Sequence, residues 1–198
     1  MPALFIGSHP ALDFLNTVYL PGEEQVEMLV DGRALLAWLV EAKFLDEAAA
    51  TKLQRRFGSK AFDVAAATAR KVREWARSWL TRWRAAPKAD YREDIAVLNR
   101  LLARGASRHE IIATDQGLRV VERAQFDSAD AVLTPILVQL AMLVSEEDPS
   151  LVRSCAGDKC TLWFLDRTKA HRRMFCSASA CGNRAKVAAF RRRQREAE

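Results

Sequence analysis

The sequence "FCSASACGNRAKVAAFRRRQREAE" (Phe175–Glu198) places two cysteines directly before a segment with five arginines. Two more cysteines lie upstream in "CAGDKC" (Cys155–Cys160), and together they give the pattern C-x4-C-x15-C-x4-C. Two close pairs of thiols allow two short loops to hold one tetrahedral zinc ion. The pattern therefore predicts a zinc site. Its expected ligands are Cys155, Cys160, Cys176 and Cys181.

These four cysteines admit three interpretations: a zinc site, two disulfides or four unrelated thiols. The first residues, "MPALFIGSHPALDF" (1–14), lack the basic start and cleavage site of a secretory signal, so we expect a cytoplasmic protein. A reducing cytosol disfavours disulfides, which favours zinc. Four thiolates leave no open coordination position, so the ion would be structural. His171 could replace one ligand, but a complete cysteine set does not require it.

The charge of the chain is segregated. Residues 151–198 hold 12 Lys and Arg against 4 Asp and Glu, a net charge of +8, which leaves 19 against 21, a net of −2, in residues 1–150. A basic element attached to a near-neutral domain is typical of proteins that bind a polyanion.

The segment after Cys181 is expected to form a helix, with Ser177 as a candidate N-cap. Helical spacing puts Val187 and Phe190 on one face, and we expect the zinc site to bury that face and leave the cations outward. A basic helix on a zinc scaffold can enter a DNA major groove or lie across phosphates. The candidate DNA-binding residues are Arg172, Arg173, Arg184, Lys186, Arg191, Arg192, Arg193 and Arg195.

Three alternatives stay open in this region. The cations could form a solvated tail that binds RNA or an acidic protein. Arg184 could bind a carboxylate such as Asp166 and fix the helix, in place of contacting DNA. Cys181 projects away from Phe190, so either the small-residue face of the helix packs on the metal site or the regular helix begins only after Gly182.

The preceding residues predict a mostly helical domain with one hairpin. Asp31 and Asp46 are candidate N-caps, and Gly58 is a helix stop. The segment His109–Arg123 alternates as two strands of a hairpin, and Pro135 either starts or kinks the apolar helix that follows. Helices are expected after Asp31, after Asp46, around Trp75–Trp83, within residues 91–105 and within residues 133–144.

The fold class is therefore α+β and predominantly α. Charge, proline and loss of periodicity coincide at "SEEDPS" (Ser145–Ser150), which predicts a domain boundary. We expect a helical sensor or dimerisation domain in residues 1–148. In residues 149–198 we expect a small treble-clef-like zinc finger with four cysteine ligands and a basic C-terminal helix. The strand of that finger is expected in "TLWFLD" (161–166).

Trp75, Trp79 and Trp83 recur every four residues in "KVREWARSWLTRW". Such a stripe is typical of a helix face buried in a core. Exposed, it would favour a homodimer interface, and the interleaved arginines also permit base stacking. We expect a core stripe.

The segment "HPALDFLNT" is unusually polar for its apolar surroundings. Its polar side chains could cap a helix and bond to buried backbone, or they could bind a small-molecule effector that changes how the finger is presented. The candidate ligand-binding residues are His9, Asp13, Asn16 and Thr17.

Several function classes lose support from the sequence. The longest apolar stretch, Ala131–Val144, is too short to cross a bilayer, so no membrane span is expected. Phosphate-binding loops, dinucleotide-binding glycine motifs, H-E-x-x-H and G-x-S-x-G do not occur in the sequence. We therefore expect a protein that is not an enzyme.

"CGNRAKVAAFRRR" resembles the hallmark of CGNR zinc-finger proteins, and the spacing of the four cysteines fits it. The segment "HPALDFLNTV" (His9–Val18) is similar to the opening motif of the ABATE domain that accompanies that finger. The resemblance covers nearly the whole chain. It implies a bacterial, stress-related transcription regulator whose finger binds DNA.

Residues and resemblance together predict a zinc-dependent regulator that presents a basic helix to duplex DNA, with one structural zinc ion. The runner-up is a zinc-stabilised module that binds RNA or protein. An enzyme acting through the first domain ranks third, and a pocket on which His9 and Asp13 converge would favour it.

Overall fold

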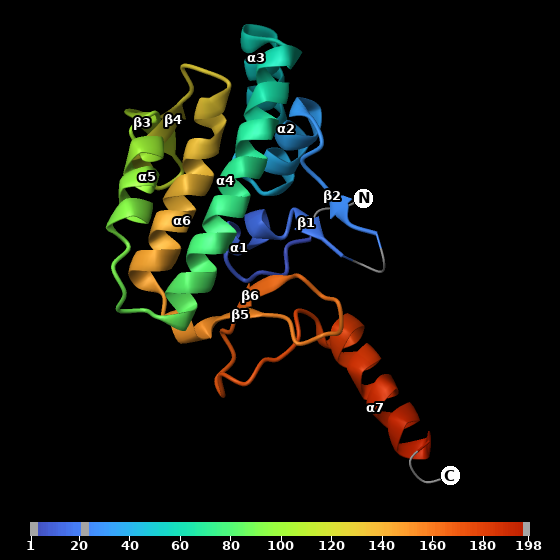
Figure 1. Ribbon diagram of the computed structural model, residues 1–198. Helices are drawn as coiled ribbons and strands as arrows, with labels where there is room; N and C mark the ends of the chain where they lie inside the picture. Colours follow the sequence, from blue (N-terminus) through green and yellow to red (C-terminus); the bar gives the residue numbers. More distant parts are fainter. Residues whose placement is uncertain (1–3, 21–23, 196–198) are drawn as a thin grey trace.

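The computed structural model describes residues 4–20 and 24–195 (Figure 1). The outermost residues of both predicted domains, 1–3 and 196–198, lie outside this range. Seven α-helices and three two-stranded sheets make up the part that is described, so the α+β, predominantly α class is confirmed. The helices are α1 (Pro10–Leu15), α2 (Gly32–Glu41), α3 (Glu47–Phe57), α4 (Ser59–Ala85), α5 (Arg92–Leu102), α6 (Thr134–Glu146) and α7 (Asn183–Arg195).

Local capping sets the helix boundaries as predicted. The Asp31 carboxylate accepts the Ala34 N–H at 2.7 Å at the start of α2, and Asp46 accepts the Ala49 N–H at 2.6 Å at the start of α3. Gly58 separates α3 from α4 at φ 82°, which glycine adopts without strain. Pro135 lies in the first turn of α6, so it starts that helix.

The tryptophan stripe of α4 lies in the core, as predicted. Trp79 and Trp83 are buried, and Trp75 is partly buried with its ring centroid 5.4 Å from that of Trp79. Because these rings pack inside one chain, the expected core stripe is confirmed for Trp79 and Trp83.

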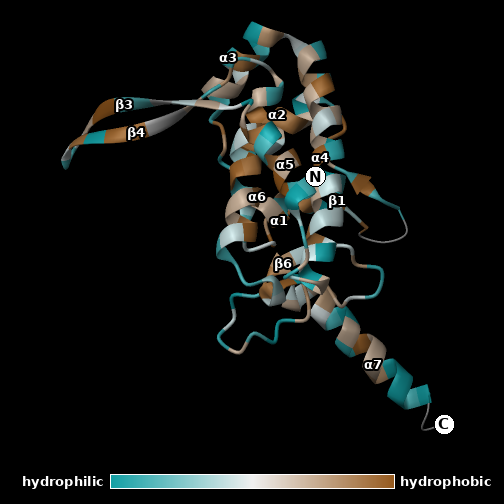
Figure 2. Ribbon diagram, turned by 60° about the vertical axis from the view of Figure 1, so that its left-hand side comes forward, coloured by the Kyte–Doolittle hydropathy of each residue, from teal (hydrophilic) through white to brown (hydrophobic). Residues whose placement is uncertain are grey.

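The predicted hairpin forms β3 (Ala106–Thr114) and β4 (Gly117–Gln125), which pair antiparallel over nine residues each. It extends away from the helices (Figure 2), with Ile111, Leu118 and Val120 exposed. Two other short antiparallel pairs join β1 (Val18–Tyr19) to β2 (Val26–Glu27) and β5 (Val152–Ser154) to β6 (Trp163–Leu165).

The segment from β5 to α7, called the finger below, packs on the preceding residues, called the body. Val152, Trp163 and Leu165 join the large core cluster of the body. A second cluster packs Phe164 and three of the cysteines against Tyr19 of β1. Cys155–Cys160 follow β5 and Cys176–Cys181 precede α7, which is a treble-clef-like arrangement. Within the described residues, none of the helices has the length and apolar character that crossing a membrane requires.

Candidate zinc centre and basic helix

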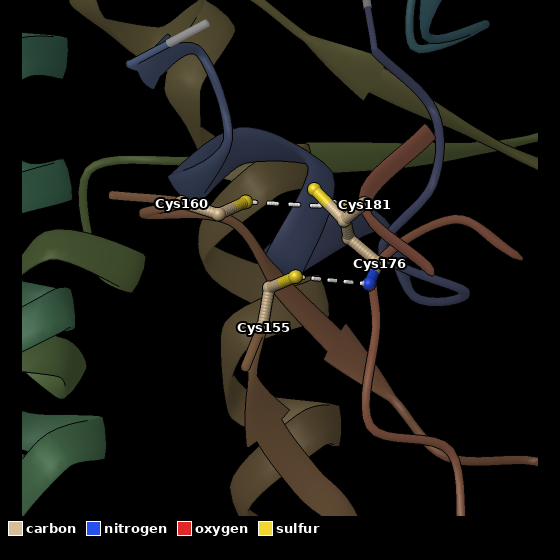
Figure 3. Close-up of side chains that lie close together, drawn as sticks. All are labelled: Cys155, Cys160, Cys176 and Cys181. Carbon is tan, nitrogen blue, oxygen red and sulfur yellow. Dashed lines mark hydrogen bonds between the residues drawn. The ribbon is translucent and has the colours of Figure 1, made fainter. Parts of the chain in front are cut away.

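The four cysteine thiols converge between the β5–β6 hairpin and the start of α7 (Figure 3). Their sulfur atoms all lie within 4.8 Å of one another. The Sγ–Sγ distance is 3.8 Å from Cys160 to Cys176 and 3.5 Å from Cys176 to Cys181. Sulfurs at about 2.3 Å from a tetrahedral zinc lie about 3.8 Å from one another. The donor set therefore fits one zinc ion.

The pKa values of the clustered thiols indicate that a cation is needed to hold them as thiolates. Burial raises the pKa of the Cys160 thiol to about 11 and also raises the pKa of Cys176. Burial opposes ionisation of Cys181 as well, but the hydrogen bond from Arg184 Nη2, 3.0 Å from Sγ, lowers the pKa of that thiol. Buried thiols become thiolates beside a strong positive charge, and a zinc ion supplies one.

Backbone geometry brings the two cysteine pairs together. A Cβ on Gly157 would lie 3.1 Å from the Cβ and Sγ of Cys181, so the first loop approaches the second most easily with glycine there. Ser177 Oγ accepts the Ala180 N–H at 3.3 Å, which confirms the predicted cap. A turn of π-helix, η3 (Ala178–Gly182), follows, and the regular helix begins at Asn183. Of the two alternatives for Cys181, the late start of the helix is therefore right.

Helix α7 differs from the prediction in its packing. None of its residues is buried, and Val187 and Phe190 remain 42% and 54% exposed. The expected burial of this apolar face against the zinc site is wrong, because α7 leaves the finger end-on and points away from the molecule (Figures 1 and 2).

The candidate DNA-binding cations fall into two groups. Arg173 turns inward: it donates to the carbonyl oxygens of Ile6 and Cys176, and its guanidinium lies 4.1 Å from the ring centroid of Phe164. Arg184 binds the Cys181 thiol, in place of the Asp166 carboxylate that the sequence also allows. The exposed members of the set are Arg172, Arg184, Lys186, Arg191, Arg192, Arg193 and Arg195.

The polar segment "HPALDFLNT" attaches the finger to the body. Asn16 is buried at the end of α1, and its side-chain amide donates to the Trp163 carbonyl oxygen at 2.9 Å and accepts the Trp163 N–H at 2.8 Å. The Leu165 N–H donates to the Gly7 carbonyl oxygen at 2.8 Å. Strand β6 is thus held by residues far earlier in the chain.

The remaining polar side chains of this segment also have internal partners. His9 Nδ1 accepts the Ala11 N–H at 3.2 Å as the N-cap of α1, and burial lowers the pKa of His9. Asp13 accepts the Gly7 N–H at 2.7 Å, and burial raises the pKa of Asp13 to about 6. His9 and Asp13 thus bind separate backbone groups. The segment caps α1 and attaches the finger to the body.

Comparison with protein families identifies both parts. The ABATE family model, described as "Putative stress-induced transcription regulator", matches residues 8–147, and the CGNR zinc finger model matches residues 152–194. The chain belongs to the ABATE family. Among the curated proteins, none matches it. Neither family is an enzyme class, and the thiol cluster lies within the residues matched by the zinc finger. This ABATE protein has one structural zinc ion.

The sequence analysis did not identify the arginines of α4 whose side chains bind other segments of this ABATE protein. Arg73 is 3% exposed, and its two terminal nitrogens bind the two carboxylate oxygens of Glu27 at 2.8 and 2.6 Å. The same guanidinium donates to the Thr17 hydroxyl at 2.9 Å. Arg77 donates to the Leu15 carbonyl oxygen. Arg84 stacks on the Trp163 ring. The signal was their spacing of four and seven residues along one helix face.

Proposed function

We propose that this ABATE protein is a zinc-dependent transcription regulator whose CGNR finger presents α7 to duplex DNA. The observation that carries the proposal is a basic helix without buried residues that starts on a folded zinc centre. Charge alone would fit a solvated tail, whereas a helix held at one end has a defined direction towards a groove or a phosphate backbone.

The proposed division of labour follows the contacts. Cys155, Cys160, Cys176 and Cys181 would hold the zinc ion, and Arg184 would fix the first turn of α7 through its bond to the Cys181 sulfur. Cations further along α7 would contact phosphates or base edges, together with Arg172 from the preceding loop. Arg173 has the least support as a DNA contact, because its guanidinium is engaged inside the protein.

The domain assignment takes its place in this proposal. It takes residues 1–148 as the helical domain and residues 149–198 as the DNA-binding domain that contains the finger. The bonds from the Asn16 side-chain amide to the Trp163 backbone and the inward side chain of Arg173 join the two, so that the helical domain sets the orientation of α7.

Fluorescence anisotropy of the intact protein on mixed-sequence duplex DNA tests the proposal across a salt series, with and without a zinc chelator. We expect a log–log salt slope of about −5 for about six phosphate contacts, and loss of binding on chelation. Binding that survives chelation would reduce α7 to a basic tail. Absence of binding at low salt would reject duplex DNA as the partner.

One observation favours the second candidate, a module that binds RNA or protein. Val187 and Phe190 form an exposed apolar edge on a helix whose other residues are mostly charged. Such an edge suits a protein groove as well as a base edge. Tighter binding to single-stranded RNA than to duplex DNA, lost in a Phe190→Ser variant, would move support to this alternative.

A further inference from the structure

The molecule has a cleft far from the zinc centre, between α3 and the root of the β3–β4 hairpin. Its volume is about 640 Å³, within the roughly 300–1,000 Å³ typical of small-molecule sites. Figure 2 shows the root of the hairpin entering the body beside α3. We infer that this cleft is a binding site for a small organic anion with an apolar body. The inference does not depend on DNA binding.

Part of the lining of the cleft is apolar, and these apolar residues come from four parts of the fold. The loop after α2, the inner face of α3, the residue after β4 and the start of α6 all contribute. Apolar lining provides the nondirectional part of small-molecule affinity. The larger apolar residues of the lining are Phe44, Leu45, Leu53, Phe126 and Pro135, and Ala49 lies among them.

Three cations line the same cleft: Lys43, Lys52 and Arg56. Lys52 and Arg56 are four residues apart on α3 and so lie on one side of that helix. Arg56 donates from Nη1 to the Phe126 carbonyl oxygen at 3.2 Å, which draws its guanidinium to the hairpin root. An anionic head group has more than one cation within reach here.

Two carboxylates, Asp46 and Glu110, also line the cleft. The Asp46 carboxylate accepts the Ala49 N–H as the N-cap of α3. Glu110 also has an interaction partner within the protein. The three cations outnumber them, so the cleft keeps a net positive charge. An acidic ligand matches this balance better than a basic one.

The end of α2 positions one of these cations, Lys43. Lys43 has φ 62°, in the left-handed region that favours glycine, at the C-terminal end of α2. Its N–H donates to the Val40 carbonyl oxygen at 2.9 Å, and the Phe44 N–H donates to that of Leu39 at 2.9 Å. A lysine here costs conformational energy that glycine would not. These two bonds are those of a common helix C-cap, and the cap places Lys43 and Phe44 at the cleft.

The ligand chemistry follows from these walls. A carboxylate, sulfonate or phosphate would pair with the lysines and Arg56, and a flat apolar body would cover Phe44, Leu53 and Phe126. This site is a candidate effector site separate from the polar segment around His9.

The test uses 8-anilinonaphthalene-1-sulfonate, an apolar sulfonate whose fluorescence rises on binding, with the intact zinc-loaded protein. Lys43→Gly removes one cation and relieves the positive φ, so we expect the melting temperature to stay within a few degrees. Lys52→Gln removes a second cation on the exposed side of α3. Lys71→Gln on exposed α4 surface is the matched control, and Leu118→Ser weakens the exposed apolar face of the hairpin as a competing dye site.

We expect saturable binding at one site, weakened about fivefold by each cleft variant and unchanged in Lys71→Gln and Leu118→Ser. Loss of binding in Leu118→Ser would assign the dye to the hairpin face and overturn the inference. Equal affinity in Lys43→Gly, Lys52→Gln and wild type would also overturn it, as would the lack of saturable binding.

Discussion

Helices α4 and α7 both carry several arginines, yet the fold uses them in opposite ways. Ten residues of the 27-residue α4 are buried, whereas none of the 13 residues of α7 is. Because the apolar stripe buries one face of α4, Arg73 and Arg77 beside it bind partners inside the protein. In α7 the only large apolar side chains are Val187 and Phe190, and they too are exposed. Arginine content therefore says little about function until the neighbouring residues decide which way the helix faces.

The largest expected effect is the loss of stability when a buried arginine of α4 is removed. Arg73→Ala leaves Glu27 partly buried without its partner and deprives Thr17 of a donor, so the free energy of unfolding should fall by about 3–5 kcal/mol. Chemical denaturation followed by tryptophan fluorescence measures it. Lys71→Ala, at an exposed position of the same helix, should change stability by less than about 0.5 kcal/mol. Equal effects would show that the buried pair contributes nothing special.

The second effect concerns how the body holds the finger. Asn16→Ala removes both hydrogen bonds to the Trp163 backbone, at a cost of about 1–3 kcal/mol for each buried group left unpaired. Hydrogen exchange should show faster exchange at β6 while α4 stays protected. Asn183→Ala, which changes an exposed asparagine at the start of α7, is the control. Unchanged protection of β6 would mean that the remaining contacts, among them the bond from the Leu165 N–H to the Gly7 carbonyl oxygen, hold the finger without Asn16.

The sequence predicts those parts of this fold where neighbours along the chain decide the outcome. The Asp31 and Asp46 caps depend on a backbone N–H three residues away, and the stripe of Trp79 and Trp83 depends on helical spacing. The cysteine cluster also belongs here, because close pairs of thiols in one short segment have few other uses.

Contacts between distant residues escape such reasoning. Asn16 and Trp163 are 147 residues apart, and neither the amide nor the tryptophan indicates the other. The exposure of Phe190 was missed for a related reason: spacing predicts an apolar face, but only the three-dimensional fold shows that no described element lies opposite it. The cleft beside α3 likewise joins four separate segments.

A third, smaller effect lies in the pH dependence of the body. Burial raises the pKa of Asp13 from its ordinary 3.8 to about 6, so the folded state holds this proton more tightly than the unfolded state does. Stability from this group is fully present below about pH 4 and is lost as the pH rises to about 6. Asp13→Asn keeps an oxygen for the Gly7 N–H and should be more stable than wild type by about 1–2 kcal/mol above pH 6.

The difference in unfolding free energy between Asp13→Asn and wild type, measured at about pH 4.5 and about pH 7.5, checks this. Protonation of the zinc thiolates affects both proteins alike and cancels in the difference. If the difference does not change with pH, the pKa of Asp13 in the folded protein is that of an ordinary carboxyl group.

The smallest expected effect on stability returns to α7 and completes the comparison. Arg191→Ala and Arg193→Ala remove exposed cations from a helix without buried residues, so each should change the unfolding free energy by less than about 0.5 kcal/mol. If α7 binds duplex DNA, each variant should lower the salt slope by about one unit and weaken binding to all sequences alike. A loss of stability as large as that of Arg73→Ala would instead show that these arginines pack inside the protein in solution, and the contrast between the two helices would fail.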